Sequence, residues 1–359
     1  IGKDGKARGW PMYYLQKGIM PEWLVAAGGA DRAKRWRVTL GVSFALMAMI
    51  ASFGVGNMVQ SNSVVDGLKY LLPESIQKGG FNLFGFEVNT FSLIIGLILA
   101  ALVGVVILGG IKRIASVASK LVPGMSVIYV LGALVILVLN ANHIAGAFAL
   151  IFKHAFTPYA AGGGAAGATV AMALRFGIAR GVFSNESGLG SAPMAHAAAK
   201  TKEMAREGFV AMLGPFIDTI IICTMTALVI IVTGAADSGM TSASLTAHAF
   251  DLGLSGYGHF IVGIGLMLFA YSTIISWSYY GDRCAQYLFG TRAVIWYRWL
   301  YTIMVVIGAI GGLKIIWDLA DVMNAMMAIP NLIGLIALAG VVVKYTNDYV
   351  KRLHAGEFD

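Results

Sequence analysis

The sequence predicts an all-α polytopic membrane protein, and three observations support this class. Of the 359 residues, 58% are hydrophobic and only 12% are charged, whereas soluble domains carry roughly 25% charged residues. The mean hydropathy is +0.77. Apolar stretches of about 18 residues or more, long enough to cross a bilayer as a helix, recur along the chain. The net charge of +8 does not indicate nucleic-acid binding, because Lys and Arg lie in short connections, where positive charge marks cytoplasmic loops.

Eight membrane-spanning segments are predicted from these apolar stretches. They cover residues 38–60, 91–111, 121–140, 166–199, 208–234, 258–281, 296–313 and 329–345. The fourth of them is irregular in composition. A shorter apolar stretch, 315–328, is too brief to cross alone, so we expect a half-span that leads into the last helix with a kink at Pro330.

The connections between the spans predict the orientation and the division of the chain. Basic residues cluster in 31–37, 111–120, 200–207, 283–298 and 344–352, whereas 235–257 contains no Lys or Arg. Basic connections are typical of the cytoplasmic side. We therefore divide the chain into an amphipathic N-terminal segment with a cytoplasmic loop (1–37), a transmembrane helical domain (38–345) and a cytoplasmic tail (346–359). Because the chain opens with Ile1 inside a polar segment, we expect that an N-terminal part precedes it.

Charged residues inside the spans are concentrated in two places. The fourth span contains Arg175, Arg180 and Glu186, and the fifth contains Asp218. Charges are costly in hydrocarbon, so these side chains are expected to face protein, water or a ligand. Asp218 is interpreted as a buried structural acid paired with Arg175 or Arg180. Glu186 and Arg180 are equally consistent with a structural ion pair and with contact to a substrate.

The fourth span also contains GVFSNESGLGSAPMAHAA (181–198), which disfavours a continuous helix. Its glycines weaken helical structure, its proline cannot donate a helical hydrogen bond, and its Ser and Asn side chains can bond to freed backbone groups. We expect one half-helix to end near Gly181 and another to start near Ser191, capped by that serine. Unwound carbonyls can bind a cation and a helix N-terminus can hold a carboxylate, as in the midplane sites of secondary transporters. Close helix packing of small residues is the alternative.

Two other spans have polar faces. In the first span, Gly56 and Gln60 lie four residues apart and share one face. In the sixth span, Ser272 and Ser276 form one such row, beside Trp277. Hydroxyl oxygens suit a hard cation such as sodium, and a tryptophan wall suits a small apolar side chain. Packing in the first span and hydrogen bonding of the hydroxyls to their own helix in the sixth remain open alternatives.

Four stretches of the sequence resemble landmarks of the alanine or glycine:cation symporter family, also called sodium:alanine symporters. RGVFSNESGLGSAPMAHAAAKT (180–201) and GFVAMLGPFIDTIIICTMTALVIIVTG (208–234) resemble its signature, and PMYYLQKG (11–18) and ASFGVGNMVQSNS (51–63) resemble other landmarks. The resemblance covers essentially the whole chain. It implies a LeuT-type (APC superfamily) inverted-repeat fold, here lacking core helices 1 and 2, in which the fourth span is the broken core helix six. A chain without those two helices is not expected to transport by itself.

The resemblance further implies sodium-coupled uptake of alanine and/or glycine by alternating access in the inner cell membrane. The implied substrate-binding residues are Gly56, Gln60, Phe183, Ser184, Asn185, Thr273 and Trp277, and the implied sodium ligands are Ser272, Thr273 and Ser276. Apart from the amino acid, sodium as coupling ion and the bilayer, no cofactor, other metal or nucleic acid is expected. The alternatives are a passive amino acid or ion channel and a membrane hydrolase using Ser184 or Ser191 with His196. The choices between alanine, glycine and a D-amino acid, and between sodium and protons, stay open at this point, as does the oligomeric state.

Overall fold

The computed structural model describes residues 9–18, 22–83, 86–156 and 170–358, and nearly all of them are helical. Within these ranges, seven helices are long and apolar enough to cross a membrane. They cover Gly29–Leu71, Thr90–Leu108, Ile111–Leu139, Met204–Val232, Gly258–Phe289, Ala293–Ile310 and Ile316–His354. Each coincides with one expected span, which confirms the prediction of a polytopic helical membrane protein. The remaining expected span, the fourth, is the broken one.

The first span is longer than predicted and contains a local change of helix type. It consists of α2 (Glu22–Phe53), a π-helical turn η1 (Gly54–Met58) and α3 (Val59–Leu71). Residues 31–37, expected to form a loop, continue α2, and the kink lies instead at Gly29, where φ is 75°. The short helix α1 (Pro11–Lys17) packs on α2 and buries Met12 and Leu15 completely.

A small β-hairpin is the one described part that departs from an all-helical chain. After α4 (Glu74–Gln77), strands β1 (Gly80–Leu83) and β2 (Phe86–Asn89) pair in antiparallel register, with Phe81 opposite Val88. The hairpin then leads into α5 (Thr90–Leu108). The Asn89 side chain accepts a hydrogen bond from the Ser92 amide at 3.0 Å, which caps α5.

The remaining elements follow in chain order as helices. They are α6 (Ile111–Leu139), α7 (Ala141–Phe156), α8 (Val170–Asn185), α9 (Ala192–His196), α10 (Met204–Pro215), η2 (Phe216–Cys223), α11 (Thr224–Val232), η3 (Ala235–Ser238), α12 (Ser242–Gly253), α13 (Gly258–Phe289), α14 (Ala293–Ile310) and α15 (Leu313–His354). The expected start of the fourth span at 166 lies outside the described residues.

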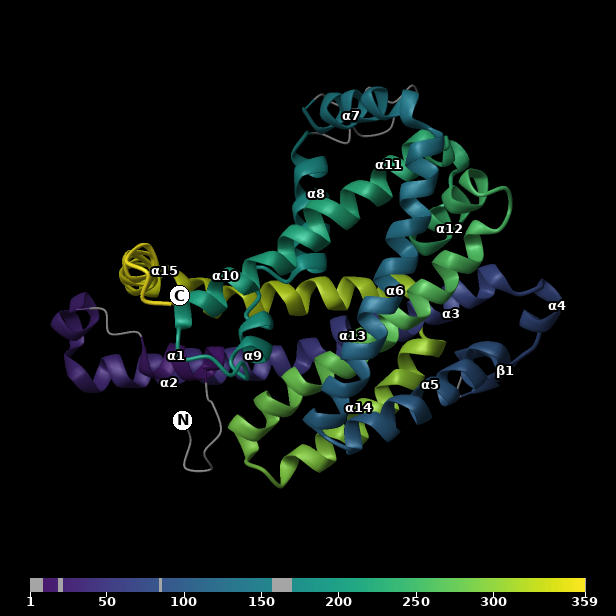
Figure 1. Cartoon of the computed structure of the whole chain (residues 1–359). Helices are drawn as coiled ribbons and strands as arrows, with labels where there is room; N and C mark the ends of the chain where they lie inside the picture. Colours follow the sequence, from purple (N-terminus) through teal and green to yellow (C-terminus); the bar gives the residue numbers. More distant parts are fainter. Residues whose placement is uncertain (1–8, 19–21, 84–85, 157–169, 359) are drawn as a thin grey trace.

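The stretch 315–328 leads directly into the last span, and the two form one helix, α15, that contains Pro330. Ala320 and Met327, on the N-terminal side of the proline, are fully buried, and so is Asn331 on its other side, at 1% exposed. Packing on both sides of Pro330 therefore holds the helix together, although the proline removes one backbone hydrogen bond. Figure 1 shows α15 running beside α2, with which it packs.

Helix α13 is at the centre of the molecule and packs against α2, α3, α6, α12 and α14. The hydrophobic cluster around Trp277 of α13 also includes Phe44 of α2, Met327 of α15, and Leu189 and Met194 from either side of the start of α9. Leu189 is 2% exposed and Met194 is fully buried. The irregular segment between α8 and α9 is therefore anchored in the core.

One buried ion pair was not predicted. Asp282 of α13 is 1% exposed and accepts hydrogen bonds from Arg298 Nε of α14 at 3.0 and 3.2 Å. Charges were expected only inside the fourth and fifth spans, because Asp282 falls one residue beyond the expected end of the sixth. The structure extends that helix to Phe289 and so brings the carboxylate inside it.

A second ion pair joins α15 to the connection before α10. Arg352 donates to both carboxylate oxygens of Glu203, at 3.0 and 2.6 Å. The Arg352 hydrogen bonds hold the pKa of Glu203 below its ordinary value, because they favour the charged carboxylate. The segment expected as a tail is helical as far as His354.

Candidate functional site

The polar stretch of the fourth span contains a true break in the helix. Helix α8 ends at Asn185 and α9 begins at Ala192. Between them the backbone enters the left-handed region at Glu186 (φ 56°), Gly188 (φ 80°) and Gly190 (φ 91°). The break is thus confirmed, but its start near Gly181 is wrong by about one turn. A single glycine such as Gly181 weakens a helix by only about 1 kcal/mol, and α8 continues through it.

The half-helix after the break is much shorter than expected. Helix α9 has five residues, and Ser191 at its start makes no side-chain cap. Instead, Ser191 Oγ donates a hydrogen bond to Glu186 Oε2 at 2.5 Å. The expectation that this helix start holds a carboxylate is therefore not supported, because a single turn develops little dipole and its leading serine is already engaged.

Glu186 joins the break to α13. Its Oε1 accepts a hydrogen bond from Trp277 Nε1 at 2.8 Å, while Ser191 binds its other oxygen. Trp277 is 2% exposed and lies directly over Gly56 of η1, where an added Cβ would lie 2.6 Å from Trp277 Cδ2 and closer still to Cβ and Cγ. The space over Gly56 is therefore occupied by the Trp277 side chain.

Ser184 and Asn185 face a different helix from the other predicted substrate residues. Ser184 Oγ donates to Asp218 Oδ2 at 2.6 Å, and Asn185 Nδ2 donates to Thr219 Oγ1 at 3.0 Å. Thr219 Oγ1 in turn donates to Asp218 Oδ2 at 3.1 Å. Both acceptor residues lie on the π-helical segment η2. The end of α8 is thus bound to η2 and not to α13.

The residues of α8 that precede Ser184 face α15. The ring centroids of Phe183 and Trp317 lie 5.0 Å apart, and the Arg180 guanidinium carbon lies 4.7 Å from the Trp317 ring centre. Arg180 also forms an ion pair with Asp321. The predicted pairing of Arg180 with Asp218 is therefore wrong, and the side chain of Arg175 lies outside the described residues.

The predicted sodium ligands of α13 bond to their own helix. Ser272 Oγ and Thr273 Oγ1 donate to the Phe269 carbonyl at 2.8 and 2.9 Å. Gln60 Nε2 similarly donates to the Val55 carbonyl at 3.2 Å. A hydroxyl that donates one hydrogen bond keeps lone pairs for a further ligand. Ser276 lies on the same helix and is half-buried.

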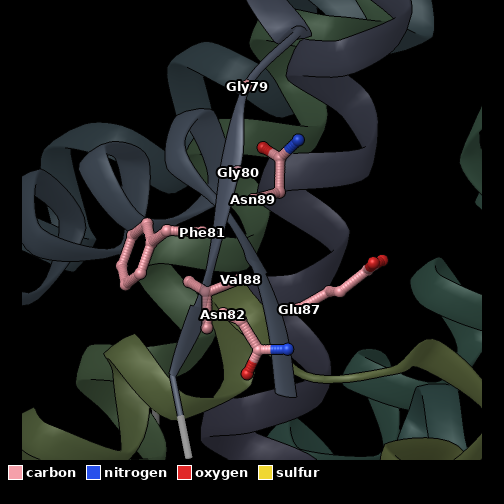
Figure 2. A pocket seen from close by; sticks show the side chains of 7 residues that line it. All are labelled: Gly79, Gly80, Phe81, Asn82, Glu87, Val88 and Asn89. Atoms are coloured by element: carbon pink, nitrogen blue, oxygen red, sulfur yellow. The ribbon is translucent and has the colours of Figure 1, made fainter. Parts of the chain in front are cut away.

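A cleft of about 680 Å³ lies beside the break, within the size range of small-molecule sites, roughly 300–1,000 Å³. Its lining includes the polar residues Ser184, Asn185, Glu186, Ser187, His196, Asp218, Tyr280 and Asn331. A second cavity, of about 480 Å³, is formed by the β-hairpin, where Phe81 and Glu87 lie on opposite sides (Figure 2). The hairpin cavity contains none of the predicted site residues, so the cleft at the break is the candidate site.

Helix α15 also holds the unwound segment between α8 and α9. Asn331 Nδ2 donates to the Gly188 carbonyl at 2.8 Å, and Asn331 Oδ1 accepts from the Tyr14 hydroxyl of α1. At Gly190 an added Cβ would lie 2.6 Å from the Phe44 ring. Asn331 could not be recognised from the sequence, because a single asparagine after a proline carries no distinctive pattern.

We expect Asn331→Ala to lower the stability of the folded protein by about 1–3 kcal/mol, because the Gly188 carbonyl and the Tyr14 hydroxyl would both lose a buried partner. The thermal midpoint in detergent measures this change. Asn324→Ala is the matched control on the same helix, since the Asn324 Oδ1 atom has no hydrogen-bond partner among the described residues. Equal losses in the two variants would contradict the assigned role.

A helical membrane protein with a broken helix beside a polar cleft has the architecture of a secondary transporter. Both serines considered for a hydrolase bond to carboxylates, and His196 Nδ1 lies 2.6 Å from Glu207 Oε1. The chain belongs to the sodium:alanine symporter family, which it matches over residues 1–359. It is a transporter and not an enzyme.

Several relatives are similar over nearly the whole chain. The sodium/alanine symporter AgcS of Methanococcus maripaludis is 43% identical over 353 residues, which cover 97% of this chain and 71% of that protein. An uncharacterised transporter of Haemophilus influenzae is 42% identical over 99% of this chain and 72% of its own length. A probable sodium/glutamine symporter, GlnT of Bacillus subtilis, is 34% identical over 98% of this chain and 66% of its own length.

Proposed function

We propose that the protein takes up alanine and/or glycine together with sodium, by alternating access in the inner cell membrane. Membership of the family supports sodium-coupled amino acid symport. The observation that carries the proposal is the helix break. There Glu186, in the break itself, and Asp218, on η2, line the same cleft. Trp277 fills the space over Gly56, which favours a substrate with a small side chain over one as long as glutamine.

The proposed substrate site is formed by the end of α8 together with η1, α3 and α13. It comprises Gly56, Gln60, Phe183, Ser184, Asn185, Thr273 and Trp277, and the sodium site comprises the α13 hydroxyls of Ser272, Thr273 and Ser276. We also propose that the fold is of the LeuT type. The helix that is broken here is the one that such a fold requires to be broken.

The coupling is tested by alanine uptake into proteoliposomes that contain the intact protein. An inward sodium gradient is expected to drive accumulation above the external concentration, and collapse of the gradient is expected to abolish it. Uptake that is unaffected by removal of sodium would reject the coupling. Rapid equilibration without accumulation would favour the passive channel.

The sodium site on α13 is tested by Ser272→Ala. Loss of one hydroxyl ligand is expected to raise the sodium concentration for half-maximal uptake by about tenfold, which corresponds to about 1.4 kcal/mol. Ser278→Ala is the matched control, because both serines donate to the carbonyl three residues earlier, at 2.8 Å for Ser272 and 2.7 Å for Ser278. An equal sodium dependence in the two variants would place the sodium ion elsewhere.

A further inference from the structure

Helix α7 follows the membrane span α6 directly, with only Asn140 between them, and is itself too short to cross a bilayer. Its 16 residues extend over about 24 Å, whereas the hydrocarbon core is about 30 Å thick. Figure 1 shows α7 lying across the ends of α6 and α8 rather than beside them. The helix therefore runs along one edge of the transmembrane bundle.

One side of α7 packs on the rest of the protein. Ala147 is 3% exposed, and Ile144 and Ile151 are partly buried in the same hydrophobic cluster, which includes Ile136 of α6 and Val229 of α11. Ile144, Ala147 and Ile151 are spaced by three and four residues, so they form one stripe along the helix. This stripe fixes α7 against α6 and α11.

A second apolar stripe of α7 is exposed. Phe148 is 39% exposed and Phe152 is 63% exposed, and Ala145 and Ala149 are exposed as well. These four residues have the i, i+3, i+4, i+7 spacing of a single helix face, which we call the phenylalanine stripe. It points about 120° away from the packed stripe, because successive residues turn by about 100°. Apolar side chains gathered on one exposed face mark an interaction surface, whereas single ones need no explanation.

The third side of α7 is polar. Asn142 and Lys153 are both exposed, and they share one face because they lie eleven residues apart, about three helical turns. The sequence of α7 contains no Asp or Glu. A helix with a phenylalanine-rich face and a polar face that carries positive charge is typical of the membrane interface, where it lies in the plane of the bilayer.

The exposed apolar surface of α6 leads up to the start of α7. Leu131 is 57% exposed, Val138 is 72% exposed and Leu139 is 70% exposed, and all three belong to a candidate membrane span. Side chains of this kind on a membrane span face lipid, up to the last residue of α6. Helix α7 begins two residues later. The phenylalanine stripe therefore continues a surface whose occupant is the bilayer.

We propose that α7 is an interfacial membrane anchor, with the phenylalanine stripe inserted among the lipid acyl chains. The face of Asn142 and Lys153 points to the headgroups and to water. This inference does not depend on the transported substrate or on the coupling ion. Helix α7 also packs on α11 and contacts α8, the half-helix that ends at the break. The membrane interface in this way supports the helix on which the break depends.

The test is the accessibility of a nitroxide spin label on the intact protein in phospholipid vesicles, with the native cysteines replaced by alanine. Phe152→Cys places the label on the phenylalanine stripe. Leu150→Cys is the matched control, because Leu150 is also exposed, at 43%, but lies two residues away and points about 160° from Phe152. Oxygen concentrates in lipid, whereas a nickel chelate stays in water. We expect the label at position 152 to be relaxed mainly by oxygen, at a depth of about 5–10 Å, and the label at position 150 mainly by the nickel chelate.

Ala149→Cys repeats the measurement with a smaller change if Phe152→Cys does not fold, because Ala149 is exposed on the same stripe. Relaxation by the nickel chelate that is equally strong on the stripe and at position 150 would overturn the anchor, since the stripe would then face water. A label on the stripe that is shielded from both reagents would also overturn it, in favour of a protein surface such as a second copy of the chain.

Discussion

Replacement of Asp282 by alanine is expected to destabilise the folded protein by about 3–5 kcal/mol, because Arg298 would keep its charge without its partner. The two side chains are 1% and 14% exposed, so water cannot replace the carboxylate. Folded proteins are stable by only about 5–15 kcal/mol, and a loss of this size removes much of that margin. We expect little monodisperse protein in detergent and a strongly lowered thermal midpoint.

Asp348→Ala provides the control for this prediction. Asp348 is 63% exposed and pairs with Arg352 one turn away at 3.0 Å, an arrangement worth about 0–1 kcal/mol. The double replacement Asp282→Leu with Arg298→Met removes both charges and is expected to recover most of the stability. If Asp282→Ala had the same thermal midpoint as Asp348→Ala, the ion pair would not have the role assigned to it.

Gly56→Ala is expected to reduce alanine uptake to background. The new methyl group would overlap the base of the Trp277 side chain, which is 2% exposed. Trp277 would be displaced, and its 2.8 Å hydrogen bond to Glu186 would break. Overpacking of a buried site costs about 1–3 kcal/mol in stability, so the protein is expected to fold while its uptake is lost.

Gly181→Ala is the matched control for Gly56→Ala. Nothing lies within 4 Å of a Cβ added at Gly181, and the residue is helical. This replacement is expected to leave uptake unchanged and to stabilise the protein by up to about 1 kcal/mol. Uptake by Gly56→Ala equal to that of Gly181→Ala would show that the contact between Gly56 and Trp277 is not required.

Features of the fold that depend on local sequence could be predicted. Seven apolar stretches long enough to cross a membrane form the seven long helices, because length and hydropathy decide that outcome. The break was also predicted, since Gly188 and Gly190 adopt backbone angles that favour glycine. Its start was misplaced, because helix propensity is weak and packing decides where a helix ends.

Features that depend on distant partners could not be predicted. Arg180 and Asp321 are separated by 141 residues, and no spacing rule connects them. The π-helical segments η1 and η2 leave no signature in the hydrophobic pattern. The β-hairpin before α5 was missed as well, because its four-residue strands lie in a polar connection.

The candidate site was predicted only in part, for a geometrical reason. Successive residues of a helix point about 100° apart, since one turn takes about 3.6 residues. Phe183 accordingly faces α15, Ser184 and Asn185 face η2, and Glu186 beyond the helix end reaches Trp277. The family resemblance implied that Phe183, Ser184 and Asn185 all surround the substrate, and the sequence left Glu186 open between a structural ion pair and contact to a substrate.

Helix α15 holds the chain before and within the break, with Asp321 bound to Arg180 before it and Asn331 bound to Gly188 inside it. These two contacts lie ten residues apart on one uninterrupted helix, a distance of about 15 Å along its axis. The helix therefore couples the two contacts, because a tilt of α15 that loosens one of them also shifts the other. A displacement of α8 at Arg180 is in this way mechanically tied to a displacement of the unwound backbone at Gly188.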